Sequence, residues 1–536
     1  MTIGMRAKSA TILMAAVFLA TACLGQSSTL ERRGMGDLGG FDKWREIEIT
    51  LAGPASQGRS DLNPFAIYVD VTFTSPTGRK YQVPGFYNGD GQGGLDGNIW
   101  MVRFSADETG TWTFASESEN SNLDGYTGSF SVGEPASDAP DFYRWGRLEA
   151  VGTASNKIRY LKFRDGSYWL KAGCDSPENF LGDYENYNTS AKRRSAVKYL
   201  ADRGINSMYI MTHNLSGDDK DVWSWLGESA GEARTNSSGS VRFDIARLEE
   251  WHQLFGYMQS EGVIPYIVLE DDSAWEGYDH ARYYREIIAR FGAFPALIFN
   301  FNEEHNENYS LSEALDYMQT LKDLDPYDHP RGIHNVNSPD EQYVDASQVD
   351  FTSIQTGDDR KATGGDPLKH NQLVVDWIRL CESRERRVLM VGVDEGRPAG
   401  DRTAWWSTYM GGGVWEAYVE KPYDQPMPAW EPVWTELGGT RTFMESLPFW
   451  QMQSHNELVI SGEAFCLATP GEVYALYLPS GGDVTVDLAP GNYESAWWRP
   501  TNGKDGQFES AQRIVGGQQI LKAPGQGDWA LRIVKR

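Results

Sequence analysis

The chain has 536 residues, of which 40% are hydrophobic and 23% charged, and its formal net charge is −26. This length exceeds that of a typical single domain, about 100–250 residues, so we expect several domains. The negative charge argues against a nucleic-acid partner, which would require a basic surface, and it weakly disfavours long-range capture of polyanions.

The first residues have the pattern of an export signal. Arg6 and Lys8 precede an apolar run over residues 10–20, which is too short to span a membrane, and Thr21-Ala22-Cys23 follow. Small residues before a cysteine resemble a bacterial lipoprotein signal, which implies cleavage after residue 22 and acylation of Cys23. Ordinary cleavage after Ala22 is the alternative. We therefore expect an exported protein, either a lipoprotein of the cell envelope (periplasmic or at the cell surface) or a secreted protein, and membrane contact only through Cys23.

Residues 23–41 are rich in glycine and polar residues, which predicts a flexible tether. The three remaining cysteines, Cys174, Cys381 and Cys466, are far apart and lack the spacing of metal ligands. We expect buried free thiols, no metal site and no cofactor.

From residue 42 to 135 short segments with partial alternation are separated by turn signals such as Pro76-Thr-Gly78 and Asn88-Gly-Asp-Gly91. This pattern predicts an immunoglobulin-like β-sandwich. Residues 455–536 return to the same pattern, with turns at Pro479-Ser-Gly-Gly482 and Thr501-Asn-Gly503. A second β-sandwich is expected there.

Between them, residues 136–454 alternate strand and helix patterns, which predicts a (β/α)8 barrel. Its expected strands are Tyr168–Gly173, Ser207–Met211, Ile264–Leu269, Leu297–Phe301, Gly332–Val336, Phe351–Gln355, Val388–Val393 and Gly413–Tyr418. Its expected helices are Ser190–Arg203, Asp244–Ser260, Tyr278–Phe291, Ser310–Lys322 and Val374–Arg384. The fold class is therefore multidomain, with a central TIM barrel flanked by two β-sandwich domains.

Two apolar strands of this barrel end in carboxylates. Asn302-Glu303-Glu304 follows the fourth expected strand and Asp394-Glu395 follows the seventh. Barrel enzymes keep their chemistry at the C-terminal ends of the strands, and hydrolysis of a glycosidic bond requires two carboxyl groups. Glu303 and Glu395 are therefore candidates for a glycosidase site.

An Asn-Glu pair ending the fourth strand and a glutamate ending the seventh are similar to the clan A glycoside hydrolases. The resemblance implies that Glu303 is the general acid/base and Glu395 the nucleophile of a retaining mechanism. It also implies that Asn302 binds the sugar 2-hydroxyl and that Trp415 forms the floor of the subsite. The motif here continues with Glu304 in place of proline, so Glu304 and, on the other strand, Asp394 remain alternatives.

A closer resemblance covers nearly all of the mature chain. Trp44, Asn63-Pro-Phe65, Arg103-Phe104 and Gly110-Thr-Trp112 resemble an N-terminal domain of unknown function that occurs on candidate bacterial glycoside hydrolases. Lys171-Ala-Gly-Cys-Asp175 and Asn302–Asn308 resemble the barrel of those proteins. Tyr474–Gly482 with Trp497-Trp498-Arg499-Pro500 resembles a C-terminal domain that carries the name collagen-binding, a family label that does not by itself imply collagen as a ligand.

Other polar or aromatic residues near the expected strand ends are weaker candidates for substrate binding, with structural hydrogen bonding, capping or packing as the alternative. They are Asp175, Glu178, His213, His334, Arg397 and Trp405. Glu270-Asp271-Asp272 follows the third strand and could be structural or a metal cluster, although no histidine has a useful spacing.

We therefore expect an enzyme, a glycosidase that cleaves O-glycosidic bonds in a polysaccharide or oligosaccharide with two glutamates and retention. A non-catalytic carbohydrate-binding or matrix-binding surface lipoprotein is one alternative, but a pure binder does not need the two glutamates. A polysaccharide lyase is the other, and it would need a tyrosine, histidine or metal-assisted base beside a uronate.

Overall fold

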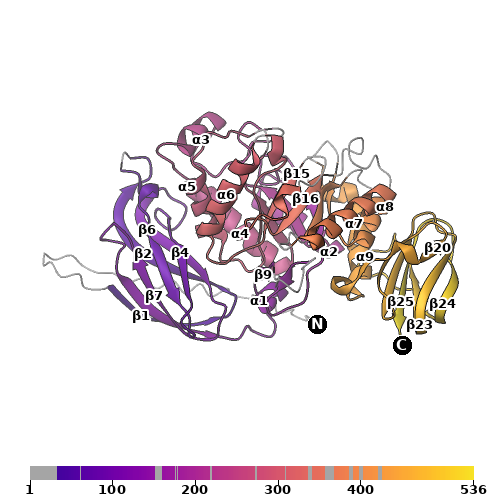
Figure 1. Cartoon of the computed structure of the whole chain (residues 1–536). Helices are drawn as coiled ribbons and strands as arrows, with labels where there is room; N and C mark the ends of the chain where they lie inside the picture. Colours follow the sequence, from indigo (N-terminus) through magenta and orange to yellow (C-terminus); the bar gives the residue numbers. More distant parts are fainter. Residues whose placement is uncertain are drawn as a thin grey trace, which may run out of the picture.

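The structure, a computed structural model, describes residues 33–60, 62–150, 160–175, 177, 179–217, 220–271, 274–307, 309–335, 341–355, 367–384, 390–396, 402–419 and 425–536; for residues 390–396 it describes the backbone alone. Figure 1 shows three parts in chain order: sheets at the N-terminal end, a central barrel with its helices, and a sheet at the C-terminal end.

Two sheets form the N-terminal part. The first has the order β1-β8-β7-β3-β4 and the second the order β2-β6-β5. Their strands are β1 (Arg33–Asp42), β2 (Glu46–Gln57), β3 (Asp70–Thr74), β4 (Lys80–Pro84), β5 (Phe86–Tyr87), β6 (Asp96–Ser105), β7 (Gly110–Glu117) and β8 (Tyr126–Gly133), and η1 (Pro64–Ala66) lies between β2 and β3.

These two sheets face each other across a shared apolar core, and the alternation is clearest in β7. In β7, Trp112 and Phe114 are buried while their neighbours are exposed, as a strand with one buried face requires. Phe73 of β3 stacks on Phe104 of β6 with ring centroids 4.0 Å apart, so the two sheets share one core.

The tether predicted over residues 23–41 is wrong for its second half. Residues from Arg33 onward form β1, which pairs in parallel with β8. The glycines there did not prevent pairing, because β8 supplies an existing edge and Phe41 packs its ring against Phe130 at 5.7 Å.

Eight parallel strands form the central barrel. They pair in chain order and β11 also pairs with β18, so the sheet is closed. The strands are β11 (Ala172–Asp175), β12 (Ser207–Met211), β13 (Ile264–Val268), β14 (Ile298–Asn300), β15 (Arg331–Asn335), β16 (Phe351–Gln355), β17 (Met390–Gly396) and β18 (Val414–Tyr418).

Helices around the barrel are α2 (Ser190–Arg203), α3 (Ala230–Ser237), α4 (Ile245–Glu261), α5 (His280–Phe291), α6 (Leu311–Leu324), α7 (Pro367–Ser383), α8 (Arg402–Gly411) and α9 (Glu431–Glu445). Within the described residues, β15 and β16 are connected through the short turn η3 (Glu341–Tyr343) and no α-helix. Before the barrel lie α1 (Asp141–Trp145) and the hairpin of β9 (Leu148–Glu149) and β10 (Lys162–Phe163).

Most expected barrel elements lie close to the observed ones, and the exceptions have physical causes. The first strand begins at Ala172 and not at Tyr168, because Tyr168 bridges to Lys162 beside the hairpin. Helices α3, α8 and α9 were not predicted. Helix α8 is buried on all sides from Ala404 to Gly411 and therefore has no amphipathic period.

The barrel interior holds a buried ion pair. Lys171 pairs with Glu416 of β18, and both side chains are fully buried. The Lys171 ammonium also lies 4.3 Å from the centre of the Tyr266 ring. Gly173, the register partner of Glu416, leaves the space for this carboxylate, since a Cβ there would come within 2.1 Å of it.

The N-terminal sheets dock onto two barrel helices. Arg103 of β6 is buried, donates to Glu249 of α4 over 2.7 Å and to the backbone carbonyl of Arg290 in α5 over 3.4 Å. His252 of α4 pairs with Glu46 of β2 at 2.9 Å. The motif residue Arg103 is therefore structural.

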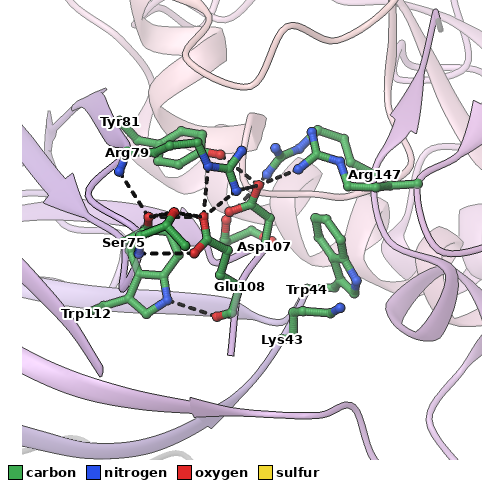
Figure 2. A network of polar contacts seen from close by, with 12 residues as sticks. Lys43, Trp44, Ser75, Arg79, Tyr81, Asp107, Glu108, Trp112 and Arg147 are labelled. Carbon is green, nitrogen blue, oxygen red and sulfur yellow. Dashed lines mark hydrogen bonds and ion pairs between the residues drawn. The ribbon is translucent and has the colours of Figure 1, made fainter. Parts of the chain in front are cut away.

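A second polar network, shown in Figure 2, lies where the N-terminal sheets meet the hairpin before the barrel. Asp107 accepts from the Tyr81 hydroxyl at 2.7 Å and from Arg79 at 2.9 Å, and it also pairs with Arg164. Trp44, whose φ is +68°, donates its indole N–H to Asp165 over 2.8 Å. These contacts fasten the two parts together.

The C-terminal part is one sheet of order β19-β21-β22-β25-β23-β20, with β24 paired to β23. Its strands are β19 (Gln453–Ser454), β20 (Val459–Ser461), β21 (Phe465–Thr469), β22 (Val473–Leu478), β23 (Asp483–Trp498), β24 (Gln512–Lys522) and β25 (Trp529–Lys535). It packs on α8, where Trp406 stacks on Tyr477 at 5.1 Å and Arg402 pairs with Asp528 at 2.7 Å.

Two further expectations concern the whole described chain. Cys174, Cys381 and Cys466 are buried free thiols, as predicted. Within the described ranges, no helix has the length and apolarity needed to cross a membrane. Cys23 lies outside the described residues.

Candidate functional site

Glu303 lies at the C-terminal end of the fourth barrel strand. It follows β14 by three residues, its exposed fraction is 5%, and its backbone N–H donates to the carbonyl of Glu270 over 2.9 Å. The next residue, Glu304, has φ +41°, a left-handed conformation that is uncommon outside glycine and asparagine. The chain therefore turns sharply directly after Glu303.

Glu395 lies near the C-terminal end of the seventh strand, β17. Val393 pairs with Trp415 and Gly396 pairs with Ala417, so two residues of β17, Asp394 and Glu395, stand opposite the single residue Glu416. This is the geometry of a β-bulge, which redirects side chains and is common beside active sites. Simple alternation therefore cannot choose between Asp394 and Glu395, whose side chains lie outside the described residues.

A buried carboxyl group, Glu270, lies beside Glu303 at the end of β13. Its Oε2 accepts hydrogen bonds from the hydroxyl groups of Tyr309 at 2.8 Å and Tyr278 at 3.1 Å. His280 Nε2 lies 4.0 Å from the same oxygen. Tyr278 and Tyr309, which come from different loops, thus fix the Glu270 carboxyl group after β13. Glu270 also contacts the turn after β14 through the backbone N–H of Glu303.

Burial determines the protonation states in this cluster. It raises the pKa of Glu270 to about 8, although the hydrogen bonds from Tyr309 and Tyr278 and the nearby Asn302 amide act in the opposite direction. Burial also raises the pKa of Tyr278 and of Tyr309 and lowers that of His280 to about 4. At neutral pH we therefore expect a protonated Glu270, neutral tyrosines and a neutral His280.

The side chain of Asn302 is fully buried, and neither its amide nitrogen nor its amide oxygen makes a hydrogen bond of regular geometry within the described residues. Because the amide N–H acts on the Glu270 carboxyl group, the amide oxygen is the atom without a partner among the described residues, and a buried acceptor left unpaired costs on the order of 1–3 kcal/mol. A polar group arriving from outside, such as a sugar hydroxyl, would remove that cost. The predicted binding role of Asn302 is consistent with this.

Two other predicted binding residues lie in the barrel. Asp175 is the last residue of β11, is fully buried, and has Tyr418 at the end of β18 as its register partner. His334 of β15 lies in the interior, where its Nδ1 is 3.3 Å from the Tyr209 hydroxyl. Glu178 and Arg397, also predicted to bind substrate, lie outside the described residues.

His213 has a structural position. Its Nε2–H donates to the backbone carbonyl of Trp275 over 3.0 Å, and its Nδ1 accepts the N–H of Leu215 at 3.4 Å. Burial lowers its pKa to about 3, so the ring is neutral. Because both ring nitrogens are used by the backbone, the prediction that His213 binds substrate is replaced by a role in positioning the loop that carries Trp275.

The two predicted sugar platforms, Trp405 and Trp415, lie in the helix layer. Trp415 is the second residue of β18 and not its end, and its ring lies 6.0 Å from His370 of α7 and 6.4 Å from Trp405 of α8. Trp405 donates its indole N–H to Thr440 of α9 over 3.0 Å. Since Glu416 points into the barrel, its neighbour Trp415 must point out; both predictions are corrected to core packing.

Sequence reasoning did not identify Tyr278, Tyr309 or Trp275 and ranked Glu270 low. Their only signal was position: each lies in a segment that follows a barrel strand at its C-terminal end. No group of three or more histidine, cysteine or acidic residues suited to a metal ion occurs in the described part of the chain.

Comparison with known proteins supports the fold. Residues 40–119 match the model of a domain of unknown function, DUF5060. No curated protein matches the chain in sequence.

Three solved structures are similar over most of the chain. A candidate glycoside hydrolase from Bacteroides vulgatus ATCC 8482 has a TM-score of 0.70 at 15% identity, covering 93% of this chain and 100% of its own. A family 5 glycoside hydrolase from the same organism has a TM-score of 0.58 at 13% identity, with coverages of 73% and 94%. A third structure named glycoside hydrolase has a TM-score of 0.56 at 13% identity, with coverages of 74% and 99%. At these identities the likeness concerns the fold.

Proposed function

We propose that this protein is a retaining glycoside hydrolase that cleaves O-glycosidic bonds in a polysaccharide or oligosaccharide. One observation carries the proposal: Glu303 and Glu395 lie at the C-terminal ends of the fourth and seventh strands of one closed parallel barrel. Barrel enzymes assemble their active sites at this end of the barrel. The similar folds of the glycoside hydrolase structures support the same reading.

In this mechanism Glu303 protonates the leaving oxygen while Glu395 attacks the anomeric carbon and forms a glycosyl-enzyme. Glu303 then removes a proton from the water that hydrolyses this intermediate. In its role as the acid, Glu303 carries its proton when the substrate binds. Asn302, buried and without a regular hydrogen bond in the described structure, would bind a hydroxyl of the sugar at the cleavage point.

The environment of Glu270 disfavours a lyase that uses tyrosine as a base. Burial raises the pKa of both Tyr278 and Tyr309, so neither hydroxyl is ionised near neutral pH. Their hydrogen bonds to Glu270 make them donors. A non-catalytic carbohydrate binder, in turn, does not require carboxyl groups at the ends of two separate barrel strands.

We also propose the types of the three domains and the cellular location of the protein. The barrel is of the (β/α)8 type of clan A, and the N-terminal sandwich predicted from residue 42 begins with β1 at Arg33 and extends to residue 135. The C-terminal part over residues 455–536 is of the type named collagen-binding, but its strands form one sheet and not the predicted sandwich of two. Cys23 carries a lipid anchor. Replacing Cys23 with serine should release the protein from the membrane fraction, whereas unchanged fractionation would exclude the anchor.

The mechanism is tested with an aryl glycoside of the sugar on which the enzyme acts, identified first with a panel of plant and algal polysaccharides. Glu395→Ala should abolish turnover, and azide should restore it with formation of a glycosyl azide of inverted configuration. Asp394→Ala is the matched control and should not show azide rescue. Rescue in Asp394→Ala alone would transfer the nucleophile to Asp394, and products of inverted configuration from the unaltered enzyme would reject retention.

A further inference from the structure

A pocket lies at the C-terminal end of the barrel, the same end that carries Glu303. Ser216, Arg234, Ala274, Trp275, Glu276 and Gly277 line it. Ser216 comes from the segment after β12 and residues 274–277 from the segment after β13, so both belong to connections at the C-terminal ends of barrel strands. Nothing in the mechanism proposed above uses these residues.

Trp275 is exposed although it is a large aromatic residue. Its exposed fraction is 37%, whereas most of the tryptophans in the described chain are fully buried. A flat apolar ring with a polar edge suits contact with the apolar face of a sugar ring. Because this ring is exposed where a pocket lies, it is accessible to a ligand.

The position of the indole is fixed from three sides. Its Nε1–H donates to the Ser237 hydroxyl over 3.3 Å, and its backbone carbonyl accepts the Nε2–H of His213 over 3.0 Å. The benzene half of the ring packs against Gly277, where an added Cβ would lie within 2.2 Å of it. A ring held in place before binding loses little conformational entropy on binding.

Arg234 supplies the polar part of the pocket. Its guanidinium carbon lies 5.3 Å from the centre of the Trp275 ring. Its Nε is buried and has no hydrogen-bond partner in the described part of the chain. Glu276 and Ser216 add acceptors beside this donor. Donors and acceptors around an aromatic ring match the alternating hydroxyl groups of an uncharged sugar.

The N-terminal domain contacts the chain segment that follows the pocket helix α3. Asn63, in a motif that characterises that domain, donates to the carbonyl of Val241 over 2.7 Å. Arg242 donates to the carbonyls of Gly58 at 3.1 Å and Ser60 at 2.8 Å. The segment that follows α3, the helix of Arg234 and Ser237, is thereby fixed to the N-terminal sheets.

We propose that Trp275 and Arg234 form a subsite for an uncharged pyranose ring of the substrate, separate from the ring that is cleaved. This inference rests on the proposed glycosidase function and assigns part of its specificity. The link to the site is short: His213 contacts both the Trp275 carbonyl and the ring of Tyr278, at 4.7 Å, and Tyr278 donates to Glu270. An extended substrate bound at Glu303 would reach Trp275 with a neighbouring sugar.

The test measures binding and turnover separately. Binding of purified protein to soluble xyloglucan, arabinoxylan and glucomannan is measured by affinity electrophoresis and calorimetry, with alginate as the charged comparison. Trp275→Ala should weaken binding of the neutral polymer at least tenfold, which corresponds to about 1.4 kcal/mol. Trp275→Phe should retain part of the affinity, and Gly277→Ala should weaken it by displacing the ring.

Tyr68→Ala is the matched control. Tyr68 is 43% exposed and lies under Arg285 at 4.8 Å, the same arrangement of an aromatic ring and an arginine, but in the segment between η1 and β3 of the N-terminal part. It should bind as the unaltered protein does. Thermal melting of each variant verifies the fold, and Arg234→Met gives a second, independent reduction in affinity.

The outcomes separate the two proposals. Unchanged binding in folded Trp275→Ala, binding of alginate alone, or no binding of any neutral polymer would each overturn the subsite. Trp275-dependent binding without turnover in the unaltered protein would support the subsite and reject the glycosidase. With turnover, Trp275→Ala should lower kcat/KM for long substrates about tenfold and lower it clearly less for an aryl monoglycoside, which does not extend to the subsite.

Discussion

The backbone N–H of Glu303 donates to the backbone carbonyl of Glu270 over 2.9 Å, so the proposed acid and a second buried carboxyl group are held on neighbouring strands. Tyr309 and Tyr278 fix the Glu270 side chain from outside the barrel. Because the pKa of Glu270 is raised to about 8, it adds no negative charge beside Glu303 at neutral pH. From this arrangement we predict how substitutions of Glu303 and Glu270 change activity and stability.

Glu303 and Glu304 can be distinguished by matched substitutions. Glu303→Gln removes the proposed proton donor and should lower kcat by about 100-fold or more for substrates with poor leaving groups, the usual scale of general acid catalysis. Activated aryl glycosides should lose much less in the first step. Glu304→Gln keeps the same chain shape at φ +41° and should change kcat less than about threefold. The reverse ranking would make Glu304 the acid.

Glu270→Gln should change how stability depends on pH. The ordinary pKa of 4.5 is raised to about 8 in the folded protein, so folded protein keeps a proton that the unfolded chain has lost. The contribution of this proton to the free energy of unfolding is complete below pH 4.5. It is lost as the pH rises through about 8, and the free energy of unfolding falls by up to about 1.4 kcal/mol per pH unit over that interval.

Glutamine cannot ionise and can still accept both tyrosine hydroxyls. Denaturant titrations from pH 5 to 9 should therefore show a shallower decline in the free energy of unfolding for Glu270→Gln. Tyr309→Phe is the companion variant, because it removes one hydrogen bond and should raise the pKa of Glu270 further. Parallel pH profiles for the unaltered protein and Glu270→Gln would contradict the buried protonated state.

The contact between α4 and the N-terminal sheets should also depend on pH. Burial and Arg103 oppose a charge on His252, but Glu46 and Glu249 outweigh them and raise its pKa above 6.5. The stabilisation is complete below pH 6.5 and is lost as the pH rises through the raised pKa. His252→Gln should cost about 1–3 kcal/mol at pH 6, the scale of a charged hydrogen bond, and clearly less at pH 9.

This experiment uses thermal or chemical unfolding at the two pH values. The carboxylates of Glu46 and Glu249 have lowered pKa values and stay ionised throughout that range, so His252 is the group of this contact that titrates. His455→Gln is a suitable control, since His455 pairs with Glu457 at an exposed position of the C-terminal part. An equal loss at pH 6 and pH 9 for His252→Gln would show that the ring contributes through packing alone.

The Lys171–Glu416 pair gives a prediction about the barrel interior. Both groups are fully buried, so removing one leaves an uncompensated charge, which typically costs about 3–5 kcal/mol. Glu416→Ala should therefore lower the free energy of unfolding strongly. The double variant Lys171→Met with Glu416→Leu should recover most of it, because the pair is replaced by apolar contacts. A double variant no more stable than the single one would indicate that contacts of the charged groups, such as that of Lys171 with the Tyr266 ring, stabilise the barrel more than apolar packing does.

The sequence alone determined the elements whose signals are local. Helix α2 and strands β12 and β16 have the predicted bounds, since capping residues and short apolar runs define them without reference to the rest of the chain. The order of the three parts, the barrel strands and the position of Glu303 after the fourth strand also followed from local patterns. The alternation of apolar and polar residues and the choice of turn residues depend on a few neighbouring positions, so the sequence alone shows them.

Only the tertiary structure decided which side chains meet. Glu416 points into the barrel, where it pairs with Lys171. Its neighbour in the strand, Trp415, therefore points outward and contacts the helix layer. The bulge opposite Glu416 removes the alternation that would rank Asp394 against Glu395. Trp275 became a candidate because its neighbours leave it exposed, and Glu270 because its neighbours exclude water. Burial is a property of the packed chain, and it sets both the protonation of a carboxyl group and the availability of a ring.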